Sequence, residues 1–352
     1  MIVDLPGRHD INRILVIKWS AMGDVVIAAA ALEDISRAFP GREIDLNTMR
    51  PWDSLFSSDP RLHDVFSVDL RGRERGLKGI RRWLRHVRSR GYDLVIDLQS
   101  SDHTRLLLGL LQLSGRGIRY RVGNVRAFPF NVGPAAHDPL APAHENVRHT
   151  LAAGGIPAET QRPRLHVPEH AEERARALLA EAGLSPKTYV VLLPGSQAAG
   201  YLKRWGAERY AALAERLFRE EGLTSVLLGG PDDVDECAAI EARSGSHIVN
   251  LCGRTELLDL VPLCASSKYI IGNDTGTAHV ASATQRPMVV ICGPTDPRRV
   301  RPMGTNVTTM QTEGLDCINC YCKRPCDHHS CMERIAPEAV HRTAIEACRN
   351  EP

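Results

Sequence analysis

Short apolar runs followed by glycine-bearing loops recur along this chain, and segments with helical periodicity separate them. The first run, residues 13–18 (RILVIK), leads into a loop with Gly23, and residues 25–39 then have the spacing of a helix that ends at Pro40. A second apolar run follows at residues 43–46. This order of strand, loop, helix and strand is that of a βαβ unit, which predicts an α/β fold with parallel sheets.

The alternation continues in two series, which a stretch without periodicity separates. Residues 127–168 are rich in Pro, Gly and His, and we interpret them as loops, one helix and a linker near residues 163–168. Further strands are predicted at residues 93–98, 118–122, 189–193, 225–228, 247–251, 269–272 and 288–292. Further helices are predicted at residues 169–182, 207–221, 256–264, 277–284 and 337–349. We therefore predict domains over residues 1–165 and 166–352, and the terminal helix could pack back on the first domain.

The loops after the strands indicate where a ligand can bind. In open parallel sheets, ligands occupy the crevice beyond the carboxyl ends of the strands. Each of the glycine-bearing loops follows a predicted strand, so the loops should gather on one edge of each sheet. Two α/β halves joined by a linker also predict a cleft between the sheets.

Charge and hydropathy restrict the compartment and the class of partner. The chain has 44 basic and 42 acidic residues, and this net charge of +2 does not require nucleic acid as a partner. No apolar run approaches the roughly 18–20 residues that cross a bilayer. The first ten residues lack the basic and apolar regions of a signal peptide. We therefore expect a cytoplasmic protein.

The most informative loop runs from Gly272 to His279 (GNDTGTAH), between an apolar run and a helical segment. Small residues let backbone N–H groups approach a ligand, and a helix N-terminus favours negative charge, so a pyrophosphate fits here. The loop at residues 293–295 (GPT), after the next strand, supports this interpretation. The alternatives are that Asp274 or Thr275 only caps the helix and that His279 is a packing residue.

A second loop, residues 194–196 (PGS), follows another predicted strand, and Lys203, Arg204 and Trp205 precede the next helix. Lys203 would approach the same edge of the sheet, where its ammonium could neutralise a phosphate. The alternative is an ordinary exposed lysine before a helix.

A third loop, residues 20–24 (SAMGD), lies in the N-terminal half and carries Asp24 at the start of a helix. Near a helix N-terminus this carboxylate should stay ionised, and it could accept a proton from a hydroxyl group. The alternative is that Asp24 is an N-cap.

Taken together and in this order, the three loops resemble glycosyltransferase family 9, the ADP-heptose:lipopolysaccharide heptosyltransferases. The similarity runs from about Arg13 to the terminal helix, and it rests on Lys18, Ser20, Gly23, Asp24 and on residues 194–196, 203–205 and 273–279. The resemblance implies a GT-B fold of two Rossmann-like domains, the first binding the acceptor and the second the donor. It also implies metal-independent, inverting transfer of a heptose from ADP-heptose to the inner core of lipopolysaccharide, with no cofactor.

The same resemblance implies roles for individual residues. Asp24 matches the catalytic base of the family, and Lys203 matches the lysine that contacts the donor phosphates. The other implied donor-binding residues are Ser196, Gln197, Asp232, Asp274, Thr275, Gly276 and His279. We also predict that Ser20, Gly23, Arg119 and Arg121 bind the acceptor, the two arginines because they add positive charge to this half of the chain.

Residues 71–90 form a basic segment with nine Lys or Arg and a single acidic residue. Ile80, Trp83, Leu84 and Val87 recur at helical spacing, which predicts a basic amphipathic helix. Such a helix can lie on an anionic membrane, which would place the enzyme on the inner face of the inner membrane beside a phosphorylated lipid acceptor. The alternative, compatible with the first, is a solvated helix that packs on the sheet through Trp83.

Five of the ten cysteines crowd into 15 residues, with two histidines among them. These cysteines are Cys317, Cys320, Cys322, Cys326 and Cys331. Their chemistry suits zinc or iron, but their spacing matches no zinc knuckle; reduced surface thiols and a redox-sensitive loop are the alternatives. The scattered Cys237, Cys252, Cys264 and Cys292 have apolar neighbours and are expected to be buried thiols.

Other functions fit part of the sequence. A GT-B enzyme could use another nucleotide sugar or a protein acceptor, and the choice of donor would distinguish it. A non-catalytic metal-binding or nucleic-acid-binding protein would use the basic segment and the cysteines, but it leaves the three loops unexplained, and we expect no nucleic acid. A dehydrogenase is disfavoured because the first βα turn has only Gly23 and lacks the three-glycine dinucleotide fingerprint.

Overall fold

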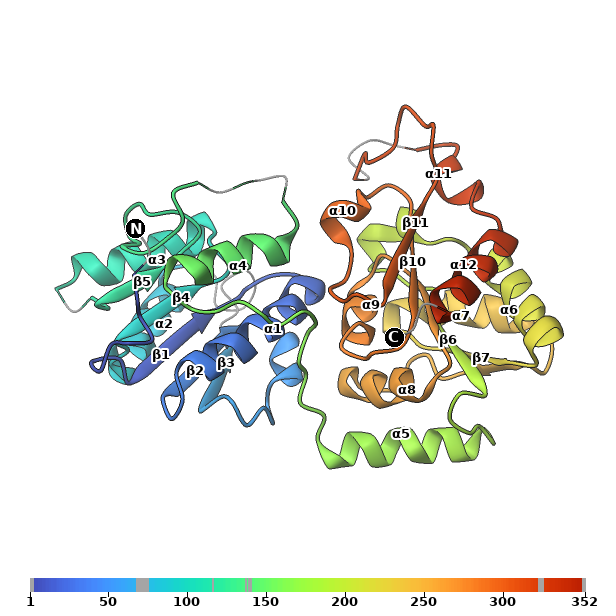
Figure 1. Cartoon of the computed structure of the whole chain (residues 1–352), viewed down its shortest axis with the longest axis horizontal. Coiled ribbons are helices and arrows are strands. Elements are labelled where there is room, and N and C mark those ends of the chain that lie inside the picture. The colour runs from blue at the N-terminus through green and yellow to red at the C-terminus, as the bar shows by residue number, and fades with distance from the viewer. Residues whose placement is uncertain are drawn as a thin grey trace. The chain divides into compact units, whose positions relative to one another are not determined.

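The structure is a computed structural model that describes residues 3–67, 76–115, 117–136, 138, 141–321 and 326–349. The chain divides into two compact units, Met1–His166 and Val167–Pro352, each with one parallel sheet and surrounding helices (Figure 1). The predicted α/β class with two Rossmann-like domains is therefore confirmed. The assignment of acceptor binding to the first unit and donor binding to the second stays a prediction.

The first unit has a five-stranded sheet in the order β3-β2-β1-β4-β5. Its strands are β1 (Arg13–Ile17), β2 (Glu43–Thr48), β3 (Asp64–Ser67), β4 (Leu94–Asp97) and β5 (Tyr120–Val122). Its helices are α1 (Met22–Ala38), α2 (Leu77–Arg90), α3 (Asp102–Leu113) and α4 (Ala143–Ala153), with a 3-10 turn at Trp52–Leu55. From β1 the chain adds β2 and β3 on one side and then returns to add β4 and β5 on the other side. The connection after β1 and the connection after β4 therefore lead to opposite sides of the sheet.

Apolar side chains explain why these segments fold together. Residues Ile14 to Ile17 of β1 are fully buried, and in α1 the small and branched apolar residues from Val25 to Leu32 are buried without a break. Trp83 of α2 is fully buried and meets Trp19 edge-to-face at 6.2 Å between ring centroids. This confirms that the basic helix packs on the core through Trp83; its membrane contact stays a prediction, and residues 71–75 lie outside the described part.

The second unit has a six-stranded sheet in the order β11-β10-β9-β6-β7-β8. Its strands are β6 (Tyr189–Leu193), β7 (Thr224–Leu227), β8 (Ile248–Asn250), β9 (Ile270–Asn273), β10 (Met288–Cys292) and β11 (Val307–Gln311). Its helices are α5 (Glu169–Glu181), α6 (Ala207–Glu221), α7 (Val234–Arg243), α8 (Leu260–Ser266), α9 (Gly276–Ala281), α10 (Pro297–Val300), α11 (Ser330–Glu333) and α12 (Pro337–Arg349). Three 3-10 turns lie at Ala198–Lys203, Pro231–Asp233 and Leu257–Asp259. Here β6 and β9 are the neighbours at which the winding reverses.

Three predicted features need revision or stay open. The helix expected at residues 256–264 is a 3-10 turn followed by α8, and the helix expected at 277–284 is only the six residues of α9. The terminal helix α12 packs against α6 and β10 of its own unit, and its packing on the first unit stays a prediction. Among the described residues, no helix is long and apolar enough to cross a membrane.

Candidate active site

The loops that follow β1 and β4 meet at the point where the winding of the first sheet reverses. The backbone N–H of Trp19 donates to Oε1 of Gln99 at 3.1 Å, which joins the two loops. The indole N–H groups of Trp19 and Trp83 both donate to Oδ1 of Asn47, at 2.9 and 2.8 Å. This buried network holds the Ser20–Asp24 loop on the crevice side of the sheet, where ligands of such folds bind.

Asp24 lies in the first turn of α1 and is half-buried. The N-cap of α1 is Ala21, without a capping side chain, so the alternative that Asp24 is the N-cap is wrong. Ser20 Oγ instead donates to Oδ2 of Asp24 at 2.5 Å. The carboxylate thus has a fixed direction and the positive end of a helix dipole beside it, while part of it stays open to a ligand.

Two buried charged groups lie beneath this loop. Lys18 is buried and donates from Nζ to the Leu98 carbonyl at 3.2 Å. Burial lowers the pKa of Lys18, and the carboxylates of Asp24 and Asp97 act in the opposite direction. Asp97 is fully buried, and burial raises its pKa to about 6 although the backbone amides of Gln99 and Ser100 donate to Oδ1. Asp97 was not among the predicted site residues. It could have been found from the sequence, because it is an acidic residue at the end of the apolar run that forms β4, the neighbour of β1.

The structure does not bring Arg119 and Arg121 to this loop. In the parallel register, Leu94 pairs with Ile14 at the start of β1 and with Tyr120 at the start of β5. Arg119 therefore lies at the amino edge of the sheet, opposite the edge that carries Asp24, where its guanidinium pairs with Asp10. Arg121 donates to backbone carbonyls including that of Pro129, so its guanidinium is engaged in holding the loop after β5.

In the second unit, three loops meet at one carboxylate. Lys203, the last residue of the 3-10 turn after β6, places Nζ 2.8 Å from Oδ2 of Asp274, which follows β9. Thr295, which follows β10, donates from Oγ1 to the same oxygen at 2.9 Å. Lys203 is therefore half of a partly buried ion pair at the reversal point between β6 and β9, and the alternative of an ordinary exposed lysine is wrong.

The remaining residues of the 272–279 loop have distinct positions. Thr275 is the N-cap of α9, and its Oγ1 accepts from the backbone N–H of Ala278 at 3.4 Å, so the capping alternative holds for Thr275 but not for Asp274. Gly276 opens α9, and His279 is buried within it. Thr275, Gly276 and Thr277 are half-buried, beside the buried Asp274.

A buried aspartate that was not among the predicted site residues organises the loop after β6. Asp233 accepts from the backbone N–H of Ser196 at 2.9 Å and from that of Gly230 at 3.0 Å, whereas the predicted Asp232 is exposed. A Cβ on Gly195 would lie 1.9 Å from the Asp233 carboxyl carbon, so only glycine fits there. The adjacent Gln197 is exposed at the start of the 3-10 turn.

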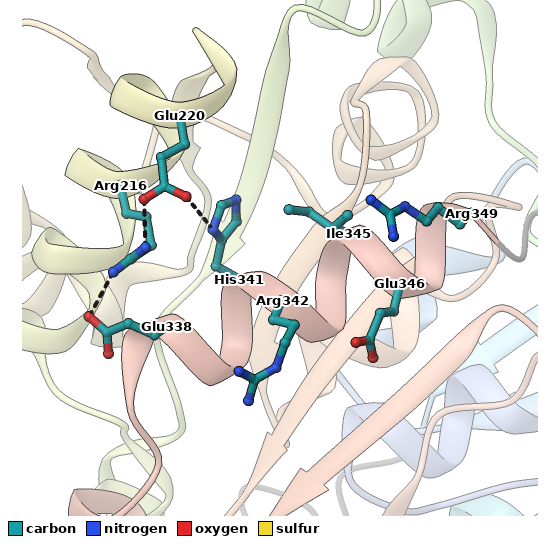
Figure 2. A pocket seen from close by; sticks show the side chains of 8 residues that line it. All are labelled: Arg216, Glu220, Glu338, His341, Arg342, Ile345, Glu346 and Arg349. Carbon is teal, nitrogen blue, oxygen red and sulfur yellow. Dashed lines mark hydrogen bonds and ion pairs between the residues drawn. The ribbon is translucent and has the colours of Figure 1, made fainter.

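A surface pocket between α6 and α12 contains none of the predicted residues (Figure 2). Part of its charge is paired internally, because Arg216 lies 2.5 Å from Glu220 and 3.1 Å from Glu338. His341 lies 3.5 Å from Glu220 and 2.7 Å from Glu221. We therefore assign this pocket to the packing of α12 on α6.

The cysteines divide as expected into scattered and clustered groups. Cys237, Cys264 and Cys292 are buried and Cys252 is half-buried, all as free thiols. In the cluster, Cys317 is exposed and Cys331 is buried, while Cys322 lies outside the described residues. Within the described part of the chain, no three Cys, His, Asp or Glu side chains already form a metal-holding group.

Comparison with known proteins identifies the family of this chain. The sequence profile of glycosyltransferase family 9 (heptosyltransferase) matches residues 80–328. Lipopolysaccharide heptosyltransferase 2 of Escherichia coli K12 is 29% identical over 302 residues, which cover 83% of this chain and 85% of the relative.

Solved structures share the fold. The family 9 glycosyl transferase of Veillonella parvula has a TM-score of 0.83 at 20% identity, over 97% of this chain and 98% of that one. The E. coli ADP-heptose lps heptosyltransferase II has a TM-score of 0.73 at 23% identity, over 96% and 99%. These likenesses confirm the predicted GT-B type of fold.

Proposed function

This chain belongs to glycosyltransferase family 9, and we propose that it transfers a heptose from ADP-heptose to the inner core of lipopolysaccharide. As a family member it is a glycosyltransferase, so the non-catalytic alternative falls away. The curated relatives are lipopolysaccharide heptosyltransferases, and one structural neighbour is described as an ADP-heptose enzyme. The observation that carries the proposal is the meeting of Lys203, Asp274 and Thr295 at one point of the second unit.

The meeting of three loops suits a diphosphate. Lys203 keeps 30% of its side chain exposed while its ammonium pairs with a buried carboxylate, so one side of the ammonium can face a ligand. An ammonium group is a compact point charge that binds phosphate oxygens without a demand for planar geometry. Donor phosphates placed here would also lie beside the backbone of Thr275 and Gly276 and the loop that Asp233 fixes through Ser196. Asp232 remains the proposed ribose contact, because its exposed carboxylate lies after β7, beside the Asp233 that fixes the loop after β6.

Asp24 supplies the base in this mechanism. Its carboxylate accepts the proton of the acceptor hydroxyl as that oxygen attacks the anomeric carbon of the donor heptose. The bond from the anomeric carbon to the ADP oxygen breaks in the same step, and Lys203 stabilises the negative charge that develops on ADP. A single displacement inverts the anomeric centre, and neither a metal ion nor a cofactor takes part.

The exposed basic face of α2 is the proposed contact with the anionic membrane that carries the acceptor. Arg81, Arg82, Arg85 and Arg88 are exposed there, while Trp83 fixes the helix to the core. Each basic residue near an anionic surface contributes about 1 kcal/mol, so the helix supplies a weak, reversible attachment. We place the enzyme on the inner face of the inner membrane on this basis.

Donor choice tests the proposal directly. Calorimetric titration should show that ADP binds at least about tenfold more tightly than UDP or GDP. Lys203→Ala should weaken ADP binding by about 10- to 100-fold, because a hydrogen bond to a charged group contributes about 1.5–3 kcal/mol. Lys187→Ala, which removes an exposed lysine from the same unit, is the control and should bind ADP as the wild type does. Preference for UDP or GDP would assign another nucleotide sugar, and no binding of any nucleotide would refute the donor site.

A further inference from the structure

Helix α3 has leucines on its inner side and on its outer side. On the inner side, Leu107, Leu108 and Leu111 are buried in the core that also holds Trp83 of α2. These three residues already supply the apolar face that a helix needs to pack on a sheet. Leucines on the outer side of α3 therefore require a separate explanation.

Three outer leucines of α3 form a stripe that solvent can reach. Leu106, Leu110 and Leu113 are 57%, 39% and 77% exposed. Positions i, i+4 and i+7 share one face of a helix, so the three side chains follow one another along α3. After the first turn, every exposed residue of α3 is one of these leucines. The outer face of a helix in water is normally polar, so the stripe indicates an interaction surface.

The ring of Phe128, in the loop after β5, extends the stripe. Phe128 is 61% exposed, and a Cβ on Gly109 would lie 3.2 Å from a carbon of its ring. The ring therefore lies against α3 at Gly109, whose neighbours one turn away on the helix surface are Leu106 and Leu113. We call Leu106, Leu110, Leu113 and Phe128 the apolar patch. Two segments of the first unit that are separate in sequence thus place apolar side chains on one surface.

The helix beside the apolar patch is strongly basic. Helix α2 packs against α3, and its 14 residues include six Lys or Arg and no Asp or Glu. In α3 the single acidic residue is Asp102, in the first turn, and Arg126 is exposed two residues before Phe128. A symmetric dimer through the patch would place two such basic surfaces at one interface, where like charges repel. Anionic lipid headgroups would instead neutralise them, and acyl chains would receive the apolar side chains.

We propose that the apolar patch inserts into the acyl-chain boundary of an anionic bilayer, while the basic face of α2 contacts the headgroups. This second attachment rests on the membrane contact proposed above for α2, and it differs from that contact in kind. Salt screens the attraction between α2 and the headgroups, whereas salt does not weaken the burial of leucine and phenylalanine side chains. Binding to a membrane therefore has a salt-sensitive part from α2 and a salt-resistant part from the patch.

Sedimentation with vesicles separates the two parts. The full chain should bind vesicles of equal parts phosphatidylglycerol and phosphatidylcholine, and part of this binding should persist in concentrated NaCl. Leu106→Gln/Leu110→Gln/Leu113→Gln should bind about 100-fold more weakly at high salt, because the apolar area that enters the bilayer is lost. Glutamine has nearly the helix propensity of leucine, so α3 should keep its structure. Phe218→Gln, which removes an exposed aromatic ring from α6, is the control and should bind as the wild type does.

A matched variant of α2 should show the opposite pattern. Arg81→Gln/Arg85→Gln should bind the same vesicles about 10- to 30-fold more weakly at low salt, since each basic residue near an anionic surface contributes to binding. At high salt this variant should bind as the wild type does, because its missing charges are then screened.

Quenching of tryptophan fluorescence tests insertion in a chain that keeps most of the patch. In Leu110→Trp, lipids brominated in their acyl chains should quench the added indole, which an apolar side chain about 5–10 Å into the boundary region can reach. The wild type, whose Trp83 is fully buried in the core, provides the background signal.

Three outcomes would overturn the inference. One is a triple leucine variant that binds vesicles as tightly as the wild type at high salt, and another is an added indole that brominated acyl chains do not quench. The third is a wild type that sediments as a dimer without vesicles while the triple variant sediments as a monomer, which would assign the patch to a second copy of this chain.

Vesicle binding requires neither a nucleotide sugar nor an acceptor. A chain that transfers heptose but fails these tests would refute the inserted patch alone. A chain that inserts into vesicles but transfers no heptose would refute the proposed function alone.

Discussion

The two units carry their charged groups in opposite ways at the points where their sheets reverse. In the first unit, Lys18 and Asp97 are buried beneath the loop, and Asp24 is the group that reaches the surface. In the second unit, the charged pair itself, Lys203 and Asp274, joins two loops, and the lysine side chain remains 30% exposed. The first unit therefore presents one carboxylate, that of Asp24, above buried polar groups. The second unit presents an ammonium group, that of Lys203, which solvent can reach.

This difference matches the two tasks of the proposed single-displacement transfer. A general base must stay in one orientation while it takes a proton, which favours a rigid support made of buried hydrogen bonds. A leaving-group site must admit and release a diphosphate, which favours a cation whose protein partner can share it with the ligand.

Asp24→Asn should lower kcat by about 10²- to 10⁴-fold, because it removes the proton acceptor without changing the shape of the loop. The affinity for ADP should stay within about twofold of the wild type, since ADP binding is assigned to the second unit and calorimetry reads it separately. Asp102→Asn, an exposed first-turn aspartate of α3, is the matched control. Equal losses of transfer in both variants, or a parallel loss of ADP binding, would contradict the role of Asp24.

Asn47→Leu should destabilise the first unit by about 3 kcal/mol. The substitution leaves the indole N–H groups of Trp19 and Trp83 buried without their acceptor, and each such group costs about 1–3 kcal/mol. Urea unfolding followed by tryptophan fluorescence measures this. Asn12→Leu, an exposed asparagine of the same unit, should stay within about 0.5 kcal/mol of the wild type. A similar small effect of Asn47→Leu would show that the network does not support the loop.

Asp97→Asn should remove a pH dependence of stability. Because burial raises the pKa of Asp97 from 3.8 to about 6, the folded state binds more protons than the unfolded state between these values. The free energy of unfolding of the wild type should therefore fall as pH rises through this window, by up to about 3 kcal/mol relative to the variant. Chemical unfolding at pH 4, 5, 6 and 7 measures the difference. If the free energy of unfolding depends on pH equally in the wild type and the variant, the carboxyl group of Asp97 is in contact with solvent.

Ser20→Ala should lower kcat about tenfold, since the hydroxyl that orients Asp24 is lost while the carboxylate remains. The affinity for ADP should not change. Ser57→Ala, an exposed serine of the same unit, serves as the control for the loss of a hydroxyl. If the Asp24→Asn/Ser20→Ala double variant has the same kcat as Asp24→Asn, Ser20 acts through Asp24. If the losses of kcat add, Ser20 has a separate role.

The central strands could be predicted because they are buried continuous apolar runs, whereas α3 and α7, which follow two of the inner strands, were missed. The predicted bounds of β6, β10 and α6 coincide with those observed, and α6 ends at Gly222 in the left-handed conformation that favours glycine. The edge strands β3 and β11 were missed. Their residues are mostly half-buried and include polar side chains, so they lack the continuous apolar run that marked the inner strands.

The sequence predicted which loops form the site, but not which of their side chains contact one another. The pairing of Lys203 with Asp274 depends on β6 and β9 being neighbours, which no local pattern encodes. Burial, which cannot be read from two adjacent aspartates, gives the structural role to Asp233 and leaves Asp232 exposed. Arg119 was grouped with Asp24 by charge, and the parallel register separates them to opposite edges of the sheet.

The most direct test of the proposed transfer is the product of the reaction itself. The purified chain would be incubated with ADP-heptose and a lipopolysaccharide inner-core acceptor, and the product linkage determined by mass spectrometry and NMR. We predict one added heptose, released ADP, and an anomeric configuration opposite to that of the donor. Retention of the donor configuration would contradict single displacement with Asp24 as the base, and transfer only from a different nucleotide sugar would contradict the heptose assignment.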